Sequence, residues 1–307
     1  MKKLSNYIIV FAILIECAAF ALLAPQFLTV DNLINVALSV AVIGILAVGM
    51  TYVILTGGID LSIGSVVALA GVFAALAARQ TGSAALGFLA ALGTALVCGA
   101  FNGFLTAYFR VPAFVVTLAA LTIARGLAFI YSEGRSIGNL PESFGKLGKT
   151  AVFGVPLAVL IMLAAFAAGW FVLAKTTFGR YVYAVGGNFE ASFLAGLNVK
   201  RITFWVYVLN GLTVGIAAIV LASRLGAGVP NSGLQYELDV IAAVVVGGTS
   251  LQGGRGSVVA TLFGTIFIGI LNNGLNLAGI DPYSQKIALG AVILLAVLAD
   301  RLGKRNA

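Results

Sequence analysis

Residues 33–56 of the chain are LINVALSVAVIGILAVGMTYVILT, an apolar run of 24 residues that contains no charged side chain. An α-helix of about 20 apolar residues is long enough to cross the hydrocarbon core of a bilayer. This run therefore predicts a helix that spans a membrane, and the question for the rest of the chain is whether the pattern repeats.

The pattern does repeat, and the sequence predicts an all-α fold: a polytopic membrane helix bundle of about ten transmembrane segments. The segments are 7–24, 33–56, 62–78, 84–108, 113–131, 157–174, 202–222, 238–250, 257–278 and 285–300. The segment 238–250 has only 13 residues, which suits an interrupted or re-entrant helix as well as a span. We expect a single transmembrane domain over residues 1–307, without a soluble appendage.

The composition agrees with a membrane protein and excludes several other classes. The chain is 61% hydrophobic and 9% charged, with a mean hydropathy of +1.10, whereas soluble domains have about 25% charged residues. Its two cysteines fall inside predicted spans, so a disulfide scaffold is excluded. The net charge of +8 comes from scattered Lys and Arg that form no basic face, which argues against nucleic acid as a partner.

The distribution of basic residues predicts the orientation of the bundle. With the N-terminus in the cytoplasm, the inner loops hold eleven Lys and Arg and the outer loops hold five. Basic residues accumulate on the cytoplasmic side, so both termini are expected there, with 132–156 outside and 175–201 inside. The first apolar stretch has 18 residues, longer than the roughly 7–15 of a signal-peptide core, and is expected to remain as an uncleaved helix.

The residue types of the chain do not form a set that an enzyme active site needs. The chain contains no histidine, which excludes a Ser-His-Asp triad and a histidine metal site. The charges embedded in spans, Glu16, Arg125 and Lys286, lie on different helices. The stretch Gly148-Lys149-Thr150 has Ser143 where a phosphate-binding loop needs glycine, and no strand is predicted before it. We expect no catalytic residues, no cofactor and no metal.

Four polar side chains are candidates for a translocation path: Asp60, Asn102, Asn272 and Asn276. An Asn exposed to lipid is costly, so those in spans should face the bundle interior or a water-filled path. Asn272 and Asn276 are four residues apart and share a helical face. The alternative for the asparagines is hydrogen bonding between helices without substrate contact. The alternative for Asp60 is capping of the helix that follows it.

Glycines mark two further features. Gly99 with Gly103, and Gly211 with Gly215, form small-xxx-small pairs that favour close helix packing. In addition, the stretch 57–68 (GGIDLSIGSVVA) is echoed by 247–260 (GGTSLQGGRGSVVA). Both have a Gly-Gly pair, a short polar stretch and GSVVA at a predicted helix start, as in transporters built from repeats, although chance explains the echo equally well.

The inner loop 175–201 mixes aromatic, aliphatic and polar residues, as a short helix on a surface does. Phe189, Phe193 and Leu194 are placed to share an apolar face. A loop this short offers that face no partner of its own, so the sequence predicts a docking surface for a cytoplasmic protein.

At this loop the sequence resembles a known family. Glu190-Ala191-Ser192-Phe193-Leu194-Ala195-Gly196 matches the EAA-x-x-x-Gly signature of permease subunits of bacterial ATP-binding-cassette importers, with Ser192 in place of the second alanine. Four further blocks resemble the ribose-type monosaccharide permeases: 53–65 (VILTGGIDLSIGS), 178–188 (FGRYVYAVGGN), 236–251 (YELDVIAAVVVGGTSL) and 271–277 (LNNGLNL). The resemblance extends over residues 27–301, nearly the whole chain.

The resemblance implies a function that composition alone does not. It implies a permease subunit in the bacterial inner membrane that pairs with a second permease copy, most simply as a homodimer. It also implies an ATPase subunit, which docks at Glu190, Ala191, Ser192 and Gly196, and a periplasmic binding protein that delivers a monosaccharide. The alternative is a self-contained secondary transporter or channel, which needs intramembrane acids for ion coupling; Glu16 alone is deeply placed. The sequence does not name the sugar.

Overall fold

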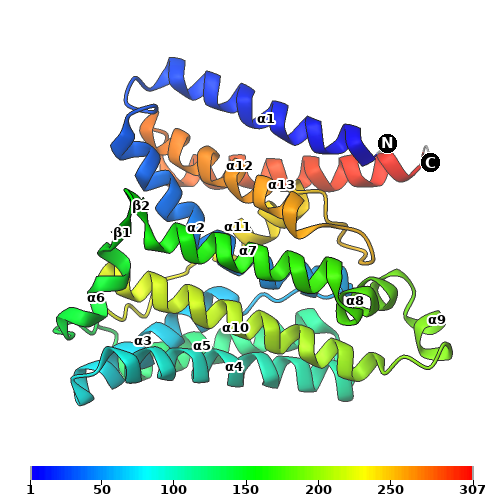
Figure 1. Ribbon diagram of the computed structural model, residues 1–307, viewed down its shortest axis with the longest axis horizontal. Coiled ribbons are helices and arrows are strands. Elements are labelled where there is room, and N and C mark those ends of the chain that lie inside the picture. Colours follow the sequence, from blue (N-terminus) through cyan, green and yellow to red (C-terminus); the bar gives the residue numbers. More distant parts are fainter. Residues whose placement is uncertain (1, 306–307) are drawn as a thin grey trace.

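The computed structural model describes the backbone of residues 2–305 and the side chains of residues 9–298, and the described chain is a helical bundle with one small hairpin (Figure 1). The predicted all-α fold is confirmed. The elements are α1 (Lys2–Leu23), α2 (Val30–Leu55), α3 (Ile63–Thr81), α4 (Ala84–Tyr108), α5 (Ala113–Ser132), α6 (Glu142–Lys149), β1 (Ala151–Val152), β2 (Val155–Pro156), α7 (Leu157–Lys175), α8 (Thr177–Gly187), α9 (Phe189–Leu194), α10 (Val199–Leu225), α11 (Tyr236–Val246), α12 (Val258–Leu277) and α13 (Pro282–Arg305).

All ten predicted segments fall on helices, but they differ in their capacity to cross a bilayer. Seven helices of the described chain are long and apolar enough to do so: α2, α3, α4, α5, α7, α10 and α12. Within the side chains described for residues 9–298, α1 and α13 contribute the apolar stretches Ile9–Leu23 and Pro282–Leu298. Helix α11 has only 11 residues, so the segment that looked too short in the sequence is indeed short in the structure.

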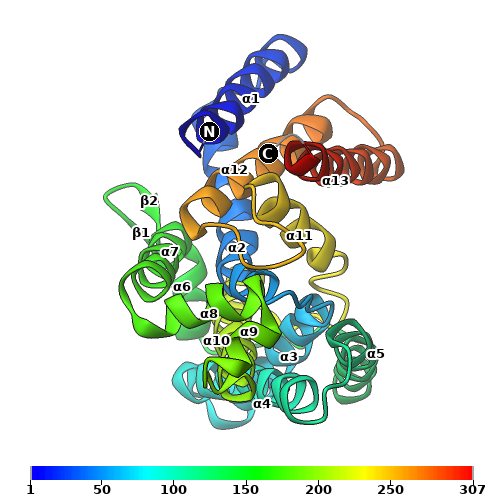
Figure 2. The ribbon, with the colours of Figure 1, turned by 90° about the vertical axis from the view of Figure 1, so that its right-hand side faces the viewer.

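The core of the bundle is built around α2. From Val40 to Leu55 nearly every residue of this helix is buried, as expected of a helix that is apolar on all sides. Figure 2 shows α2 in the middle of the molecule, between α11 and α12 on one side and α3 and α10 on the other. Helices α4, α5 and α7 lie at the periphery and leave most of their surface exposed.

The two predicted glycine pairs face each other. A Cβ atom placed on Gly99 of α4 lies 2.6 Å from the carbonyl oxygen of Tyr207 and 2.9 Å from the Cα of Gly211 on α10. A Cβ on Gly211 in turn lies 2.6 Å from the carbonyl oxygen of Ala95. Such close backbone approach is available only to glycine, and it gives α4 and α10 the most extensive helix contact in the bundle.

The connections gather at two opposite ends of the bundle. Helix α6 and the β1–β2 hairpin lie at one end, and α8 and α9 lie at the other (Figure 1). The start of α1 and the end of α13 lie at the same end as α9. The two loops assigned to opposite sides of the membrane from their basic residues are thus at opposite ends of the molecule.

The embedded Arg125 of α5 finds carbonyl groups where the sequence offered no partner. Its Nη1 donates to the carbonyl oxygens of Pro230 at 2.7 Å and Ser232 at 2.8 Å. These residues lie in the loop between α10 and α11, so the guanidinium ties that loop to α5.

At the start of α13, hydrogen bonds from Ser284 hold the pKa of Asp281 below its usual range.

Candidate translocation cleft and coupling segment

A polar cleft of about 420 Å³ lies between α2, α11, α12 and α13. Its walls combine apolar side chains with hydrogen-bonding groups from three helices and one loop. The polar lining consists mainly of Gln235, Asp239, Asn272, Asn273, Asn276, Gln285 and Lys286. Donors and acceptors therefore converge in a cavity large enough for a small polar molecule.

The three asparagines of α12 separate into two roles. Asn273 and Asn32 exchange side-chain hydrogen bonds of 2.8 and 3.0 Å, which join α12 to α2. Asn272 lies on the adjoining face, where its Nδ2 is 3.4 Å from Oδ1 of Asp239. Asn276 lines the cleft with Asn272, as their spacing of four residues predicted. All three asparagines line the cleft, but Asn273 also spends its side chain on the bond between helices that the structural alternative describes.

The other two path candidates lie elsewhere, in a buried polar cluster. Asp60 accepts hydrogen bonds from the backbone amide and hydroxyl of Ser62, at 2.9 and 2.6 Å, and from Nδ2 of Asn210 at 2.8 Å. Asn102 donates to the Ser62 hydroxyl at 2.9 Å. The cavity beside this cluster measures only about 10 Å³. Asp60 and Asn102 are thus brought together, but apart from Asn272 and Asn276.

Some polar residues of these two sites were missed in the sequence. Asn210 lies in the middle of α10 and was visible as an intramembrane asparagine. Asp239 lies near the start of α11, and Gln235 comes just before it, with φ at +68°. No sequence signal places Asp239 against α12 or Asn210 against Asp60, because both links are tertiary contacts between segments more than 30 residues apart.

The predicted docking surface consists of α9 and the turn after it. Asn188 caps α9 through its Oδ1, which accepts from the amide of Ala191 at 2.9 Å. Phe189, Phe193 and Leu194 are 50%, 59% and 83% exposed, although these are large apolar side chains. Ser192 faces inward and is buried. The apolar face predicted from the sequence is therefore present and uncovered in the single chain.

The turn after α9 depends on Gly196. Its φ of +83° belongs to the left-handed region, and its amide bonds back to the carbonyl oxygen of Phe193 at 3.0 Å. This is the usual way in which glycine ends a helix. A side chain here strains the backbone even though the space around Gly196 is open.

Helix α8 connects this surface to the core through a junction, which we define as Leu55, Gly186, Gly253 and Gly254. The amide of Gly254 donates to the carbonyl oxygen of Leu55 at 2.9 Å. A Cβ atom on Gly186 would overlap that same carbonyl oxygen and lie 2.7 Å from the Gly254 nitrogen. The backbones of α8, the end of α2 and the loop after α11 therefore meet without intervening side chains.

A second contact holds α8 against the same loop. The Tyr183 hydroxyl donates to the carbonyl oxygen of Gly256 at 2.8 Å. Burial raises the pKa of the Tyr183 hydroxyl above its ordinary value. The two Gly-Gly stretches that echo each other in the sequence both follow helix ends, with φ of +81° at Gly57 and +86° at Gly248. Through Gly186 and Tyr183, α8 contacts the chain at both of these helix interruptions. That the two stretches are structural repeats stays a hypothesis.

Comparison with known proteins places relatives over nearly the whole chain. Residues 32–297 match the family model described as "Branched-chain amino acid transport system / permease component". The ribose import permease protein RbsC of Haemophilus influenzae is 43% identical over 293 residues, which are 94% of this chain and 91% of that protein. The corresponding protein of Escherichia coli is 45% identical over the same shares.

A relative with another sugar in its name is nearly as similar. The L-arabinose transport system permease protein AraH of Escherichia coli is 41% identical over 295 residues, which are 96% of this chain and 89% of that protein. No solved structure matches the chain.

Proposed function

The chain belongs to the family of permease components of branched-chain amino acid transport systems, and we propose that it is the membrane permease of an ATP-binding-cassette importer for a monosaccharide. The observation that carries this proposal is the similarity to ribose and arabinose import permeases, at 41–45% identity over more than nine-tenths of the chain. A self-contained secondary transporter or channel is not favoured by these relatives. The sugar itself belongs among pentoses or related monosaccharides.

The cleft between α2, α11, α12 and α13 is our candidate for part of the sugar path. A sugar presents hydroxyl groups that each donate and accept hydrogen bonds, and the cleft offers amides, a carboxylate and an ammonium group. Its volume of about 420 Å³ falls within the range of about 300–1,000 Å³ that is typical of small-molecule sites. We assign Asn272 and Asn276 to this path.

Asp60 and Asn102 fit a structural role better. Their hydrogen bonds with Ser62 and Asn210 connect the segment after α2 to α4 and α10. A path through this cluster requires it to open in another conformation, because the present cavity is too small for a sugar. We propose that the cluster fixes the helix interruption at Gly57-Gly58 in place.

The two ends of the molecule suit two different partners. We assign the α9 end to the cytoplasm and to a separate ATPase, so that both termini lie there and ATP hydrolysis belongs to the partner. The segment of contact contains Glu190, Ala191, Ser192 and Gly196, of which Ser192 is buried under the helix, and the exposed Phe193 and Leu194. We assign the β1–β2 end to a periplasmic binding protein, and we propose that a second copy of this single-domain chain completes the permease.

Uptake into proteoliposomes tests the proposal. The permease is reconstituted with the ATPase and binding protein of the same importer, and a panel of labelled pentoses and hexoses is offered. We expect uptake of one or a few sugars that requires ATP and both partners. Uptake driven by an ion gradient in liposomes that lack the ATPase would show instead that the chain is a secondary transporter.

The cleft assignment predicts distinct effects for neighbouring asparagines. Asn272→Leu removes a polar group that faces the cleft, and a hydrogen bond lost from a buried partner costs about 1–3 kcal/mol. We expect uptake at low sugar concentration to fall about 5- to 150-fold, with normal amounts of permease in the membrane. Asn276→Leu is expected to act in the same direction.

Asn32→Leu is the matched control, because it breaks the pair with Asn273 and Asn32 does not line the cleft. It is expected to lower the amount of folded permease and to reduce uptake only in proportion. If uptake in Asn272→Leu also follows abundance, this asparagine is a packing residue and the cleft assignment is wrong.

A further inference from the structure

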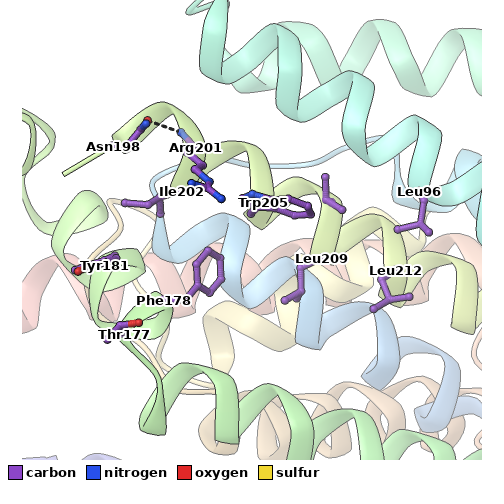
Figure 3. A pocket seen from close by; sticks show the side chains of 11 residues that line it. Leu96, Thr177, Phe178, Tyr181, Asn198, Arg201, Ile202, Trp205, Leu209 and Leu212 are labelled. Carbon is purple, nitrogen blue, oxygen red and sulfur yellow. Dashed lines mark hydrogen bonds between the residues drawn. The ribbon is translucent and has the colours of Figure 1, made fainter.

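A wide groove lies on the outer face of the bundle, between α4, α8 and α10 (Figure 3). Its volume is about 730 Å³. Along α10 the lining side chains follow one another from Arg201 through Ile202, Trp205 and Leu209 to Leu212, as Figure 3 shows. Phe178 of α8 and Leu96 of α4 form the two flanks.

The polar groups of the groove are confined to one end. Thr177, Asn198 and Arg201 lie at the α8–α9 end, and Tyr181 stands beside them. Beyond Trp205 the named lining is entirely aliphatic: Val208, Leu209, Leu212 and Leu96. A groove that is charged at one end and apolar along the rest of its length fits an amphiphile, which has a charged head group and an apolar chain.

The length of the groove matches one leaflet of a bilayer. Arg201 and Leu212 are eleven residues apart on one helix, which corresponds to about 16 Å at about 1.5 Å per residue. The hydrocarbon core of a bilayer is about 30 Å thick, so a single leaflet contributes about 15 Å. The groove thus runs from the membrane surface at the α9 end to the bilayer midplane. Trp205 lies near its polar end, at the depth where interfacial aromatic residues gather.

The charged end of the groove favours an anionic ligand, because its charged residue is Arg201. No acidic residue lines the groove, and Arg201 has no ion pair within the side chains described for residues 9–298. Its backbone amide donates to Oδ1 of Asn198 at 3.0 Å (Figure 3), and its guanidinium makes no hydrogen bond within the described part of the chain. Lys200 precedes it, and both lie in the first turn of α10, where the helix dipole adds positive potential.

We propose that this groove is a binding site for one acidic phospholipid of the cytoplasmic leaflet. Its phosphate pairs with Arg201, and one acyl chain lies along Trp205, Leu209 and Leu212. The assignment to the cytoplasmic leaflet rests on the proposed orientation of the permease. The choice of an acidic phospholipid rests only on the residues that line the groove. Because the site lies on the face of α8 and α10 next to α9, an occupied groove also braces the segment that meets the ATPase.

The test measures lipid retention by the full-length permease in nanodiscs that contain equal parts of phosphatidylglycerol and phosphatidylcholine. After extraction into mild detergent, native mass spectrometry gives the lipids that stay bound. We expect wild-type permease to retain phosphatidylglycerol about fivefold over phosphatidylcholine, the preference that one basic residue at a membrane surface provides. Arg201→Ala is expected to lose this preference, and Leu209→Trp to lose the retained lipid with the charge intact.

Arg180→Ala is the matched control, because Arg180 is an exposed basic residue of α8 that does not line the groove. It is expected to retain lipid as the wild type does. Equal loss in Arg180→Ala would mean unspecific surface attraction, and equal retention of the two lipids by the wild type would mean an ordinary boundary lipid; either result overturns the site. The readout needs neither sugar nor ATPase, so it stands or falls separately from the transport function.

Discussion

Gly186→Ala is expected to reduce sugar uptake about 5- to 150-fold, while the permease remains in the membrane and still binds its ATPase. The added methyl group meets the Leu55 carbonyl and the Gly254 amide, both of which are backbone atoms that no side-chain rotation can move. Overpacking of this kind costs about 1–3 kcal/mol, against a typical folding stability of about 5–15 kcal/mol. The protein should therefore fold, but a coupling free energy of the same size is lost.

Gly187→Ala is the control for this variant. A Cβ atom on Gly187 meets nothing within 4 Å, and the two glycines are neighbours at the end of the same helix. Uptake and ATPase activity of Gly187→Ala should match the wild type. If Gly186→Ala transports normally, α8 does not act on the core through this junction; if it fails to accumulate in the membrane, the junction is needed for folding rather than for coupling.

Glu190→Lys and Ala195→Glu are expected to weaken association with the ATPase about 30-fold, since a central interface residue contributes about 2 kcal/mol. Both positions are exposed on or next to α9, beside Phe193 and Leu194. Ala195→Glu adds a charge that has to be buried when the partner docks, whereas it is solvated in the free permease. Glu190→Lys reverses an existing charge, which opposes any basic group of the partner. Co-purification of the ATPase measures the effect, and sugar uptake should disappear with it.

Ala195→Glu separates charge from backbone strain, which Gly196→Glu does not. Gly196 has positive φ, so any side chain there deforms the turn before its charge matters. Ala151→Glu is the matched control, because it puts the same charge on an exposed alanine of β1 at the opposite end. If both alanine variants recover the ATPase equally, α9 is a solvated connection and not a docking helix.

The sequence predicted what depends on local pattern. Apolar runs of about 20 residues gave all the long helices, since the length of a span is set by the thickness of the bilayer. The spacing of Asn272 and Asn276 placed them on one face, and the structure puts both in the cleft. The exposed apolar face of α9 likewise followed from the residues in a short loop that offers no cover.

The pairing of distant segments could not be predicted in the same way. Asp60 and Asn210 are 150 residues apart, and nothing in either stretch names the other. The glycine pairs of α4 and α10 were each recognisable, but not that they face each other. Asn273 illustrates the same limit, because only the contact with Asn32 distinguishes it from Asn272 and Asn276.

Photo-crosslinking from two exposed phenylalanines tests most directly that the α9 end receives the ATPase. Phe193 lies on α9, and Phe153 lies in the turn of the β1–β2 hairpin at the opposite end; both side chains are exposed. A photoreactive phenylalanine analogue is placed at one position or the other in cells that contain the whole importer. The account predicts an adduct with the ATPase from position 193 and none from position 153. An ATPase adduct from position 153, or equal absence of adducts from both, would contradict it.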